Sequence, residues 1–242
     1  MSNEIAESLV GQLVSQRPAR ARIFDSFGID YCCGGGKSLA AACSARNLDV
    51  DTVVAVLRAF DAEAAAPADS RDWTKASMAE LCDHIEQTHH AYLKQELPRL
   101  EQCLRKIAAR HGPGDARLVE LLDVFLSFRA ELEQHAMKEE RILFPLIRRL
   151  EAGDSPTTFH CGSVNNPIRV MVMEHDHAGA ALARMRDLTD GYQAPPDACN
   201  TYRSTMDAML QLERDMHRHV HKENSILFPR AAEAEAKAAC AS

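Results

Sequence analysis

Two segments of the sequence place a histidine four residues before a glutamate. Residues 135–145 read HAMKEERILFP and residues 219–229 read HVHKENSILFP, so seven of eleven positions agree at a constant offset of 84. Residues four apart in a helix lie on one face, so His135 and Glu139 can bind the same cation, as can His219 and Glu223. The repeat predicts a duplicated helical hairpin with a pair of metal ligands in each half.

The repeat also distinguishes between two adjacent carboxylates. Glu139 is followed by Glu140, but the second copy has a carboxylate only at Glu223 and places Asn224 at the next position. We therefore expect Glu139 to bind the metal and Glu140 not to bind it.

Both ligand pairs lie on apolar faces of their helices. The first face contains Phe128, Leu132, His135, Glu139, Ile142 and Leu146, and the second contains Leu212, Met216, His219, Glu223 and Ile226. Burial of an unpaired carboxylate costs several kcal/mol, so each inward-facing pair needs a compensating partner. A metal cation is such a partner.

The third helical segment supplies another histidine. His175 follows Val172 by three residues and precedes Leu182 by seven, which places it on the inward face of that helix. We expect His175 to be a further ligand.

The first helical segment offers three histidines, His84, His89 and His90. His89 and His90 are adjacent and cannot both point inward. Spacing alone does not choose between them, although His90 aligns with Leu93 and Leu97.

A set of four histidines and two glutamates suits iron or manganese better than a structural zinc ion, which usually takes four Cys and His ligands. Two six-coordinate ions can share this set if Glu139 and Glu223 bridge them. We therefore expect two Fe ions in a non-haem di-iron centre. The open positions would take an oxo or hydroxo bridge and a diatomic ligand, NO or dioxygen.

The composition limits the other classes of function. Apolar residues make up 46% of the 242 residues, charged residues 26%, and the formal net charge is −7. Binding to nucleic acid relies on clustered Lys and Arg, so no nucleic acid is expected as a partner. The first twenty residues lack a basic apolar leader, and no apolar run is long enough for a bilayer. We expect a cytoplasmic protein with no membrane partner and with reduced cysteines.

Apolar residues recur every three or four positions along most of the chain, which predicts an all-α fold. We expect a small helical N-terminal domain over residues 1–62, a linker over 63–76, an antiparallel four-helix bundle over 77–232 and a C-terminal tail over 233–242. The four helices are expected at 77–110, 115–149, 165–190 and 197–232. A homodimer is compatible with the sequence.

Several motifs resemble the family known as RIC, repair of iron centres, which joins a small N-terminal domain to a hemerythrin-like bundle. They are the segment MKEERILFP from Met137, EHDHAG from Glu174, ENSILFPR from Glu223 and DYCCGG from Asp30. The resemblance covers nearly the whole chain. It implies His90, rather than His89, as the first-helix ligand, together with His135, Glu139, His175, His219 and Glu223.

The resemblance also implies a function. It identifies Cys32 and Cys33 as the thiol motif of the N-terminal domain, which could relay iron or redox equivalents; the alternative is a tight helix cap. Apart from the resemblance, Glu174 precedes His175 and could orient a ligand or hold a proton near the metal, or it could be a solvated glutamate. Members of the family restore iron–sulfur clusters damaged by nitric oxide or peroxide, so damaged iron–sulfur proteins are the implied partners. Iron donation, NO removal and reduction of NO to nitrous oxide are compatible mechanisms. The alternative is a hemerythrin-like carrier or sensor of dioxygen or NO without turnover.

Two features depart from the family pattern. Three glycines, Gly34 to Gly36, follow the cysteine pair where two are expected. The loop from Gly153 to Pro167 is longer than usual and contains His160 and Cys161. The first could alter how the thiols are presented, and the second could bind metal transiently.

Overall fold

The computed structural model describes residues 2–63, 71–153 and 162–240. His160 and Cys161, singled out in the long loop, lie outside these residues. The chain divides into two compact units, one of residues 1–81 with 217–242 and the other of residues 82–216. The division falls within helix α11 (Asn200–Lys222).

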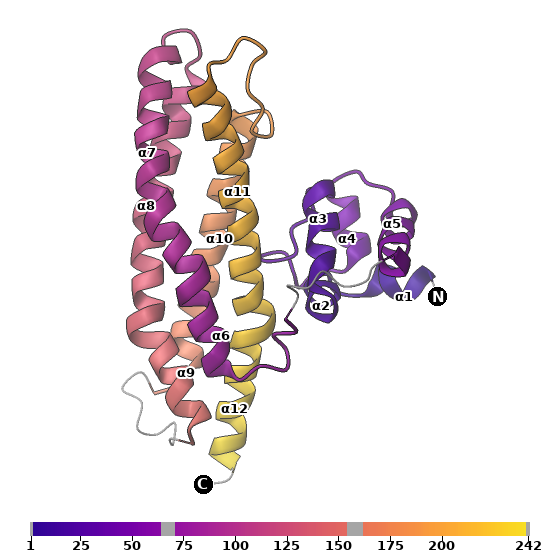
Figure 1. Cartoon of the computed structure of the whole chain (residues 1–242). Coiled ribbons are helices and arrows are strands. Elements are labelled where there is room, and N and C mark those ends of the chain that lie inside the picture. The colour runs from indigo at the N-terminus through magenta and orange to yellow at the C-terminus, as the bar shows by residue number, and fades with distance from the viewer. Residues whose placement is uncertain (1, 64–70, 154–161, 241–242) are drawn as a thin grey trace. The chain divides into compact units, whose positions relative to one another are not determined.

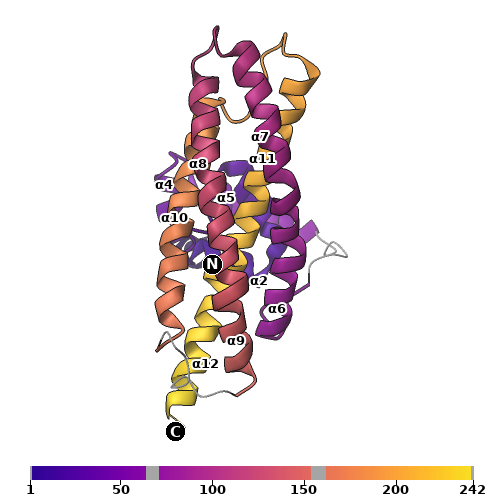
Figure 2. The same cartoon turned by 90° about the vertical axis from the view of Figure 1, so that its left-hand side faces the viewer.

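The unit of residues 82–216 is a bundle of four helical rods. The first is η2 (Ile85–His90) followed by α7 (Ala91–His111), and the second is α8 (Arg117–Lys138) followed by η3 (Glu139–Leu143) and α9 (Phe144–Glu151). The third is α10 (Asn165–Leu188), and the fourth is the first part of α11. Figures 1 and 2 show the four rods side by side, and α8 packs directly on α7 and α10.

The core of the bundle follows from the apolar periodicity of each rod, because residues spaced by three or four positions face the same way. Its fully or nearly fully buried side chains come from all four rods and include Leu97, Leu104, Phe125, Leu132, Met185 and Met209. The all-α fold class expected from the sequence is confirmed. Among the described residues, the only β-type pairing is an isolated β-bridge between Leu9 and Ser38.

Three short segments of the helical rods are π-helical rather than α-helical. They are η2, η3 and η5 (Glu223–Leu227), and in each the peptide N–H after the segment donates to the carbonyl five residues earlier. In η3 and η5 that carbonyl belongs to Glu139 and Glu223. The prolines that follow, Pro145 and Pro229, have no N–H to donate and crowd the carbonyl of the preceding turn, which favours a widened turn there.

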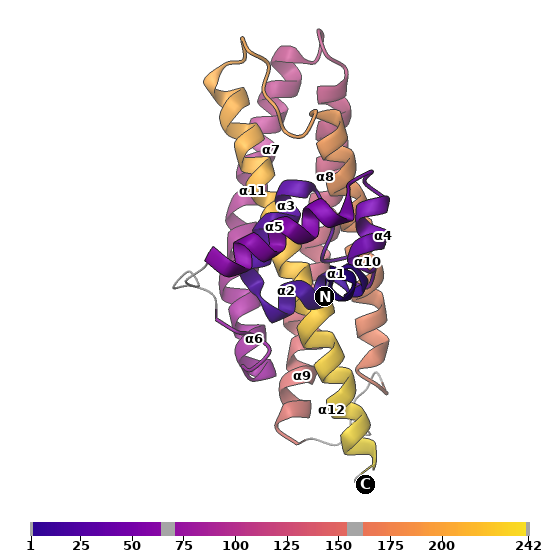
Figure 3. The ribbon, with the colours of Figure 1, turned by 90° about the vertical axis from the view of Figure 1, so that its right-hand side faces the viewer.

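The unit formed by residues 1–81 and 217–242 contains the small N-terminal helices. They are α1 (Ser2–Glu7), α2 (Val10–Gln16), η1 (Pro18–Arg20), α3 (Ala21–Phe27), α4 (Leu39–Ser44) and α5 (Val50–Glu63). Helix α5 packs on α1 and α4, as Figure 3 shows. The unit also contains most of α6 (Met78–His84), the end of α11, η5 and α12 (Phe228–Cys240), which continues past residue 232.

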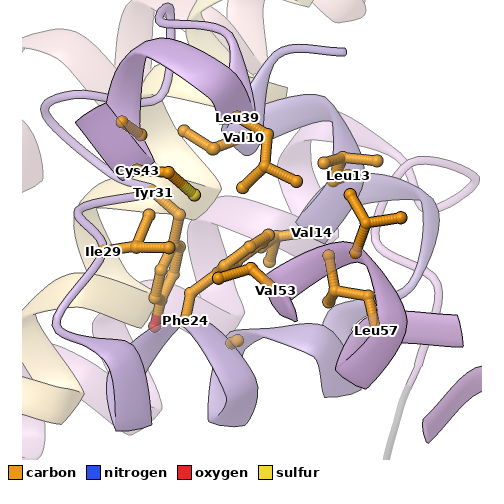
Figure 4. Close-up of a cluster of buried hydrophobic side chains, with 13 residues drawn as sticks. Val10, Leu13, Val14, Phe24, Ile29, Tyr31, Leu39, Cys43, Val53 and Leu57 are labelled. Carbon is orange, nitrogen blue, oxygen red and sulfur yellow. The ribbon is translucent and has the colours of Figure 1, made fainter. Parts of the chain in front are cut away.

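The N-terminal helices enclose one hydrophobic cluster (Figure 4). Phe24 and Tyr31 are fully buried in it and their rings lie 6.1 Å apart. At the surface, the Asp61 carboxylate accepts hydrogen bonds from Arg17 and Arg20 and ties the end of α5 to the segment around η1. This packing fixes the turn between α3 and α4, which carries the cysteine pair.

None of the described helices is both long and apolar enough to span a bilayer. The predicted domain boundaries at residues 62, 76 and 232 stay a prediction.

Candidate metal centre

The expected ligands of the bundle are buried, and their ligand atoms face one another. Glu139 is fully buried, and its two carboxylate oxygens lie 3.3 Å from His90 Nε2 and 3.3 Å from His135 Nε2. Nε2 of His175 lies 3.1 Å from Nε2 of His135. Glu139 of the second rod therefore lies between His135 of the same rod and His90 of the first rod.

Glu140 determines which ring nitrogen of His90 carries the proton, because its carboxylate contacts Nδ1, the nitrogen that faces away from Glu139. The Nδ1–H group of His90 donates to Glu140 Oε1 at 2.9 Å, and Lys94 Nζ donates to the same oxygen at 2.7 Å. In the neutral imidazole this leaves the lone pair on Nε2, which points at Glu139. The ring is also held by Phe144, which stacks on it with centroids 5.8 Å apart.

His135 has the same arrangement. Its Nδ1–H group donates to Glu174 Oε2 at 2.9 Å, and Lys138 donates to the other oxygen of Glu174. Its Nε2 lone pair therefore points at Glu139 and at His175. At 3.1–3.3 Å a proton or a cation must lie between this lone pair and the neighbouring nitrogen and oxygen atoms, and a metal bound in place of the proton would be ligated by all of them.

Glu140 and Glu174 form a matched pair of supporting carboxylates. Burial opposes ionisation of both, but hydrogen bonds from a lysine and a histidine outweigh it and lower the pKa of each. Both stay anionic at neutral pH, and an anion at Nδ1 increases the basicity of Nε2 toward a metal. Each ligand histidine is thus oriented and made a better donor.

The second repeat copy provides the remaining pair. His219 and Glu223 are fully buried, and Nε2 of His219 lies 3.0 Å from Glu223 Oε1. They are four residues apart, His219 near the end of α11 and Glu223 at the start of η5, as the repeat predicts.

The six side chains fall into two overlapping groups, each able to hold one cation. The first is His90, Glu139, His219 and Glu223, and the second is His135, Glu139, His175 and Glu223. Within each group the ligand atoms lie within 4.8 Å of one another. Glu139 and Glu223 belong to both groups, which is the arrangement that bridging carboxylates require.

His89, which the sequence alone could not separate from His90, lies elsewhere. Its Nδ1 is 3.0 Å from both oxygens of the Asp215 carboxylate, and it belongs to neither group. The contact between buried His89 and half-buried Asp215 joins the first and fourth rods.

Two pockets reach the ligands from opposite sides of α8. One, of about 360 Å³, lies between α8 and α10 and is lined by His135, His175 and the Lys138–Glu174 pair. The other, of about 370 Å³, lies between α7 and α8 and is lined by His90 and the Lys94–Glu140 pair. Each pocket has room for a diatomic molecule or several waters next to a ligand imidazole.

The cysteine pair lies in the turn between α3 and α4. Cys32 is buried and Cys33 is half-buried, and their sulfur atoms are 3.9 Å apart. The hydrogen bond with Cys33, burial and the nearby Asp30 carboxylate raise the pKa of Cys32 well above its usual value. Cys32 is therefore a protonated thiol at neutral pH unless a cation replaces its proton.

The extra glycine after the cysteine pair can now be located. A Cβ at Gly35 would come 2.7 Å from the carbonyl oxygen of Tyr31, and a Cβ at Gly34 would come 3.1 Å from Asp30. A Cβ at Gly36 would meet nothing within 4 Å. The close contacts favour glycine at positions 34 and 35, whereas position 36 has room for a side chain and best fits the extra residue.

Tyr31 joins the cysteine turn to the end of α11. Its ring packs edge-on against His217 at 5.9 Å and against His221 at 5.7 Å between centroids. These histidines flank His219 along the helix. The residue before the thiols therefore contacts the segment that carries a predicted metal ligand.

Comparison with known proteins agrees with these observations. Residues 82–231 match the model of the hemerythrin HHE cation-binding domain, and residues 6–61 match a domain of unknown function, DUF542. A probable iron-sulfur cluster repair protein of Haemophilus influenzae is 33% identical over 93% of this chain and 96% of its own length. The iron-sulfur cluster repair protein YtfE of Musicola paradisiaca is 35% identical over 95% of this chain and 98% of its own length. The chain belongs to the RIC family.

Membership in the RIC family confirms the resemblance drawn from the sequence motifs, and with it the hemerythrin-like bundle behind a small N-terminal helical region. The bundle of this RIC protein contains a cation-binding site built from buried His and Glu side chains.

Two residues of the expected apolar faces are misplaced by the sequence analysis. Ile142 is 40% exposed, whereas Ile226, at the matching position of the second copy and in the same kind of π-helical turn, is 6% exposed. Val172 is 37% exposed, and Met171, four residues before His175, is the buried neighbour instead. Packing decides whether the apolar residue three positions or four positions from a ligand is the buried one, and periodicity alone does not.

Sequence reasoning also missed the Lys94–Glu140 and Lys138–Glu174 pairs as units. Glu140 was excluded as a ligand, but it binds the far side of His90. The one signal available was that Glu140 is a second carboxylate next to a buried one. Its partners come from another helix, and their identity depends on how the helices pack.

Proposed function

We propose that this protein repairs damaged iron–sulfur clusters and that His90, His135, Glu139, His175, His219 and Glu223 hold a non-haem di-iron centre for that purpose. The observation that carries the proposal is the convergence of imidazole lone pairs on the Glu139 carboxylate at 3.3 Å or less, with each imidazole backed by an anion. Glu139 and Glu223 serve as the bridging carboxylates.

The donor set fits iron. Nitrogen and carboxylate donors without thiolate suit Fe²⁺ and Fe³⁺, and two shared carboxylates supply enough donors for two ions while leaving positions open. When bound, such a centre supplies open iron coordination for a diatomic ligand and iron that can leave as cargo.

The chain's own side chains control access to the centre. Glu140 and Glu174 hold the two imidazoles in place, and Lys94 and Lys138 neutralise those carboxylates at the pocket walls. NO or dioxygen can reach the centre through either pocket. Iron, as the substrate of repair, can leave on the same paths toward a damaged iron–sulfur protein.

The relatives support this proposal. Those from Haemophilus influenzae, Musicola paradisiaca and Escherichia coli carry names that describe iron-sulfur cluster repair, and each aligns over more than nine-tenths of the chain. Removal of NO, its reduction to nitrous oxide, and a homodimeric state are further proposals.

The test begins with iron per chain and the visible spectrum of aerobically purified protein, for wild type and for His219→Ala. We expect about two iron ions in the wild type and loss of iron and its charge-transfer band in the variant. His177→Ala is the control, because His177 is exposed on α10 and belongs to neither ligand group.

The second step adds the loaded protein to a [4Fe–4S] enzyme inactivated by NO or by peroxide. Recovery of that enzyme's activity with wild type and His177→Ala, but not with His219→Ala, supports repair. Zinc alone, or no metal after iron supplementation, overturns the di-iron centre. Bound iron that takes up dioxygen reversibly without any recovery of the client would identify a carrier.

A further inference from the structure

The turn between α3 and α4 brings three side chains with metal-binding atoms together. Asp30, Cys32 and Cys33 each have a ligand atom within 4.8 Å of the others. No side chain of the bundle's two ligand groups is among them. The cluster is thus separate in composition from the centre described above, and it contains the only thiols among the candidate ligand groups of the described residues.

The distances in this cluster match those of a chelate. Metal–sulfur bonds of about 2.3 Å at a tetrahedral angle place two sulfur ligands about 3.8 Å apart. The sulfurs of Cys32 and Cys33 are 3.9 Å apart. A sulfur and a carboxylate oxygen on one such ion lie about 3.1–3.6 Å apart for angles between 90° and the tetrahedral value, and Cys32 Sγ lies 3.1 Å from Asp30 Oδ1.

The backbone of the turn holds these atoms in place. Asp30 Oδ1 accepts a hydrogen bond from the Cys32 peptide N–H, and Oδ2 accepts one from the Gly34 N–H, both at 2.9 Å. Gly35 packs against the Tyr31 carbonyl so closely that a side chain there would overlap it. A chelate whose ligands are already ordered binds a cation at a smaller entropic cost.

We propose that Asp30, Cys32 and Cys33 form a mononuclear site for a divalent cation of borderline softness, Fe²⁺ in the course of iron transfer. Binding forms two metal–sulfur bonds and one metal–oxygen bond, and two thiol protons pass to solvent. No electrons are transferred. The proton that now joins Cys32 Sγ to Asp30 Oδ1 is replaced by the cation.

Three protein ligands leave a fourth position for an exchangeable group. Cys32 is 4% exposed, whereas Cys33 is half-buried, so an outside ligand reaches the ion past Cys33. Water or a thiolate of a damaged cluster protein can occupy that position. A site with an open position passes its ion on more readily than a closed tetrahedral site does.

A disulfide between the two cysteines is the competing interpretation. It would require the sulfurs to move from 3.9 Å to about 2.05 Å in an adjacent pair, whose ring is strained. It also needs an oxidant, which nothing in the turn supplies. The metal site uses all three side chains as they stand.

The role in iron transfer rests on the proposed repair function, whereas metal binding rests on the turn alone. The test uses the iron-loaded full-length protein under a mild thiol-free reductant, titrated with Co²⁺. A cobalt–thiolate charge-transfer band in the near ultraviolet reports thiolate coordination, which neither bundle group can supply. Its dependence on Cys32 and Cys33 assigns the band to this turn rather than to another cysteine of the chain.

We expect one equivalent of Co²⁺ to produce the band in the wild type. Cys32→Ser and Cys33→Ser should each reduce its intensity by about half and weaken Co²⁺ binding at least about tenfold. Asp30→Asn should weaken binding to a similar degree while both sulfur bonds remain. Cys199→Ser, which removes an exposed free thiol, is the control and should bind as the wild type does.

Asp30→Asn can also loosen the turn, so Cys33→Ser, which leaves the hydrogen bonds of Asp30 intact, decides the matter. No band in the wild type, or a band unchanged in both cysteine variants, overturns the site. A band and affinity unchanged in Asp30→Asn overturn the role of Asp30. The cobalt band can confirm the site while the cysteine variants still repair clusters at the wild-type rate. That result would overturn the role of this turn in repair and leave the proposed repair function itself standing.

Discussion

The bundle and the cysteine turn present opposite surroundings to a cation. In the bundle, the proposed imidazole and carboxylate ligands come from several helices and are almost fully buried, and two of the imidazoles are oriented by supporting carboxylates. In the turn, two thiols and a carboxylate come from four consecutive residues, and one thiol is half-exposed. The bundle depends on tertiary packing, whereas the turn depends on local backbone geometry.

As proposed metal sites, the two regions would differ in how readily they release an ion. Ligands spread over several helices release an ion only when several contacts break, and a local chelate with an open position exchanges its ion readily. Changes in the bundle should therefore alter how much iron is bound, and changes in the turn should alter how fast iron moves.

The largest difference between the two sites is expected from a substitution of Glu139, which belongs to both ligand groups of the bundle. Glu139→Ala should remove both ions, whereas His175→Ala, which belongs to one group, should remove about one of two. Metal analysis of both variants after identical iron supplementation checks this. Glu120→Ala, at an exposed glutamate paired with Arg184, should retain wild-type iron. Equal losses in Glu139→Ala and His175→Ala would contradict a shared carboxylate.

A smaller effect is expected from the supporting carboxylates. Glu140→Gln and Glu174→Gln keep the shape of the side chain but remove the charge, so Nε2 of the partner histidine becomes a weaker donor. Loss of such a contact typically costs about 10- to 100-fold in metal affinity. The rate of iron extraction by a chelator measures it.

Glu133→Gln is the matched control, because Glu133 is an exposed glutamate on α8 that pairs with Arg129. Extraction rates that are the same for Glu133→Gln, Glu140→Gln and Glu174→Gln would show that the supporting carboxylates have no influence on the metal.

The turn can be disturbed without touching any ligand. Gly35→Ala places a methyl group 2.7 Å from the Tyr31 carbonyl and should destabilise the N-terminal helices by about 1–3 kcal/mol. Gly36→Ala, with open space around it, should change stability by less than about 0.5 kcal/mol. Thermal unfolding together with iron content measures both, and iron in the bundle should be retained. A larger loss of stability in Gly36→Ala would contradict the assignment of Gly36 as the extra residue.

The smallest effect is expected outside both sites, at the start of α6. Hydrogen bonds from Arg71 and from Ser77 lower the pKa of Glu80 to about 2. The stabilisation is therefore fully present above the ordinary glutamate value near 4.5 and is lost as pH falls toward 2. NMR titration of Glu80 and of the Arg71→Gln variant measures the shift. In that variant the pKa should rise toward 4.5 with no change in bound iron at neutral pH.

The helical fold and most residues of the candidate centre could be predicted from the sequence because both depend on short-range spacing. His135 with Glu139, and His219 with Glu223, are four residues apart, and the repeat marked them without any knowledge of packing. His90 could not be separated from His89 in the same way. The two are adjacent in sequence, and only the residues of other helices that each one contacts distinguish them.

The supporting contacts could not be predicted because they join residues far apart in the chain. Glu174 reaches His135 across 39 positions, and Glu140 reaches His90 across 50. The exposure of Ile142 could not be predicted for a similar reason. Ile226 occupies the matching position of the repeat and is buried, so the difference comes from the packing around each copy and not from local sequence.

The widened turns after Glu139 and Glu223 bear on the history of the chain. The two copies align without a gap and have the widened turn at the same position, directly at the predicted bridging carboxylate. The turn therefore belongs to the repeated unit, and the simplest history is that the hairpin already had it, with the ligand pair, when it was duplicated.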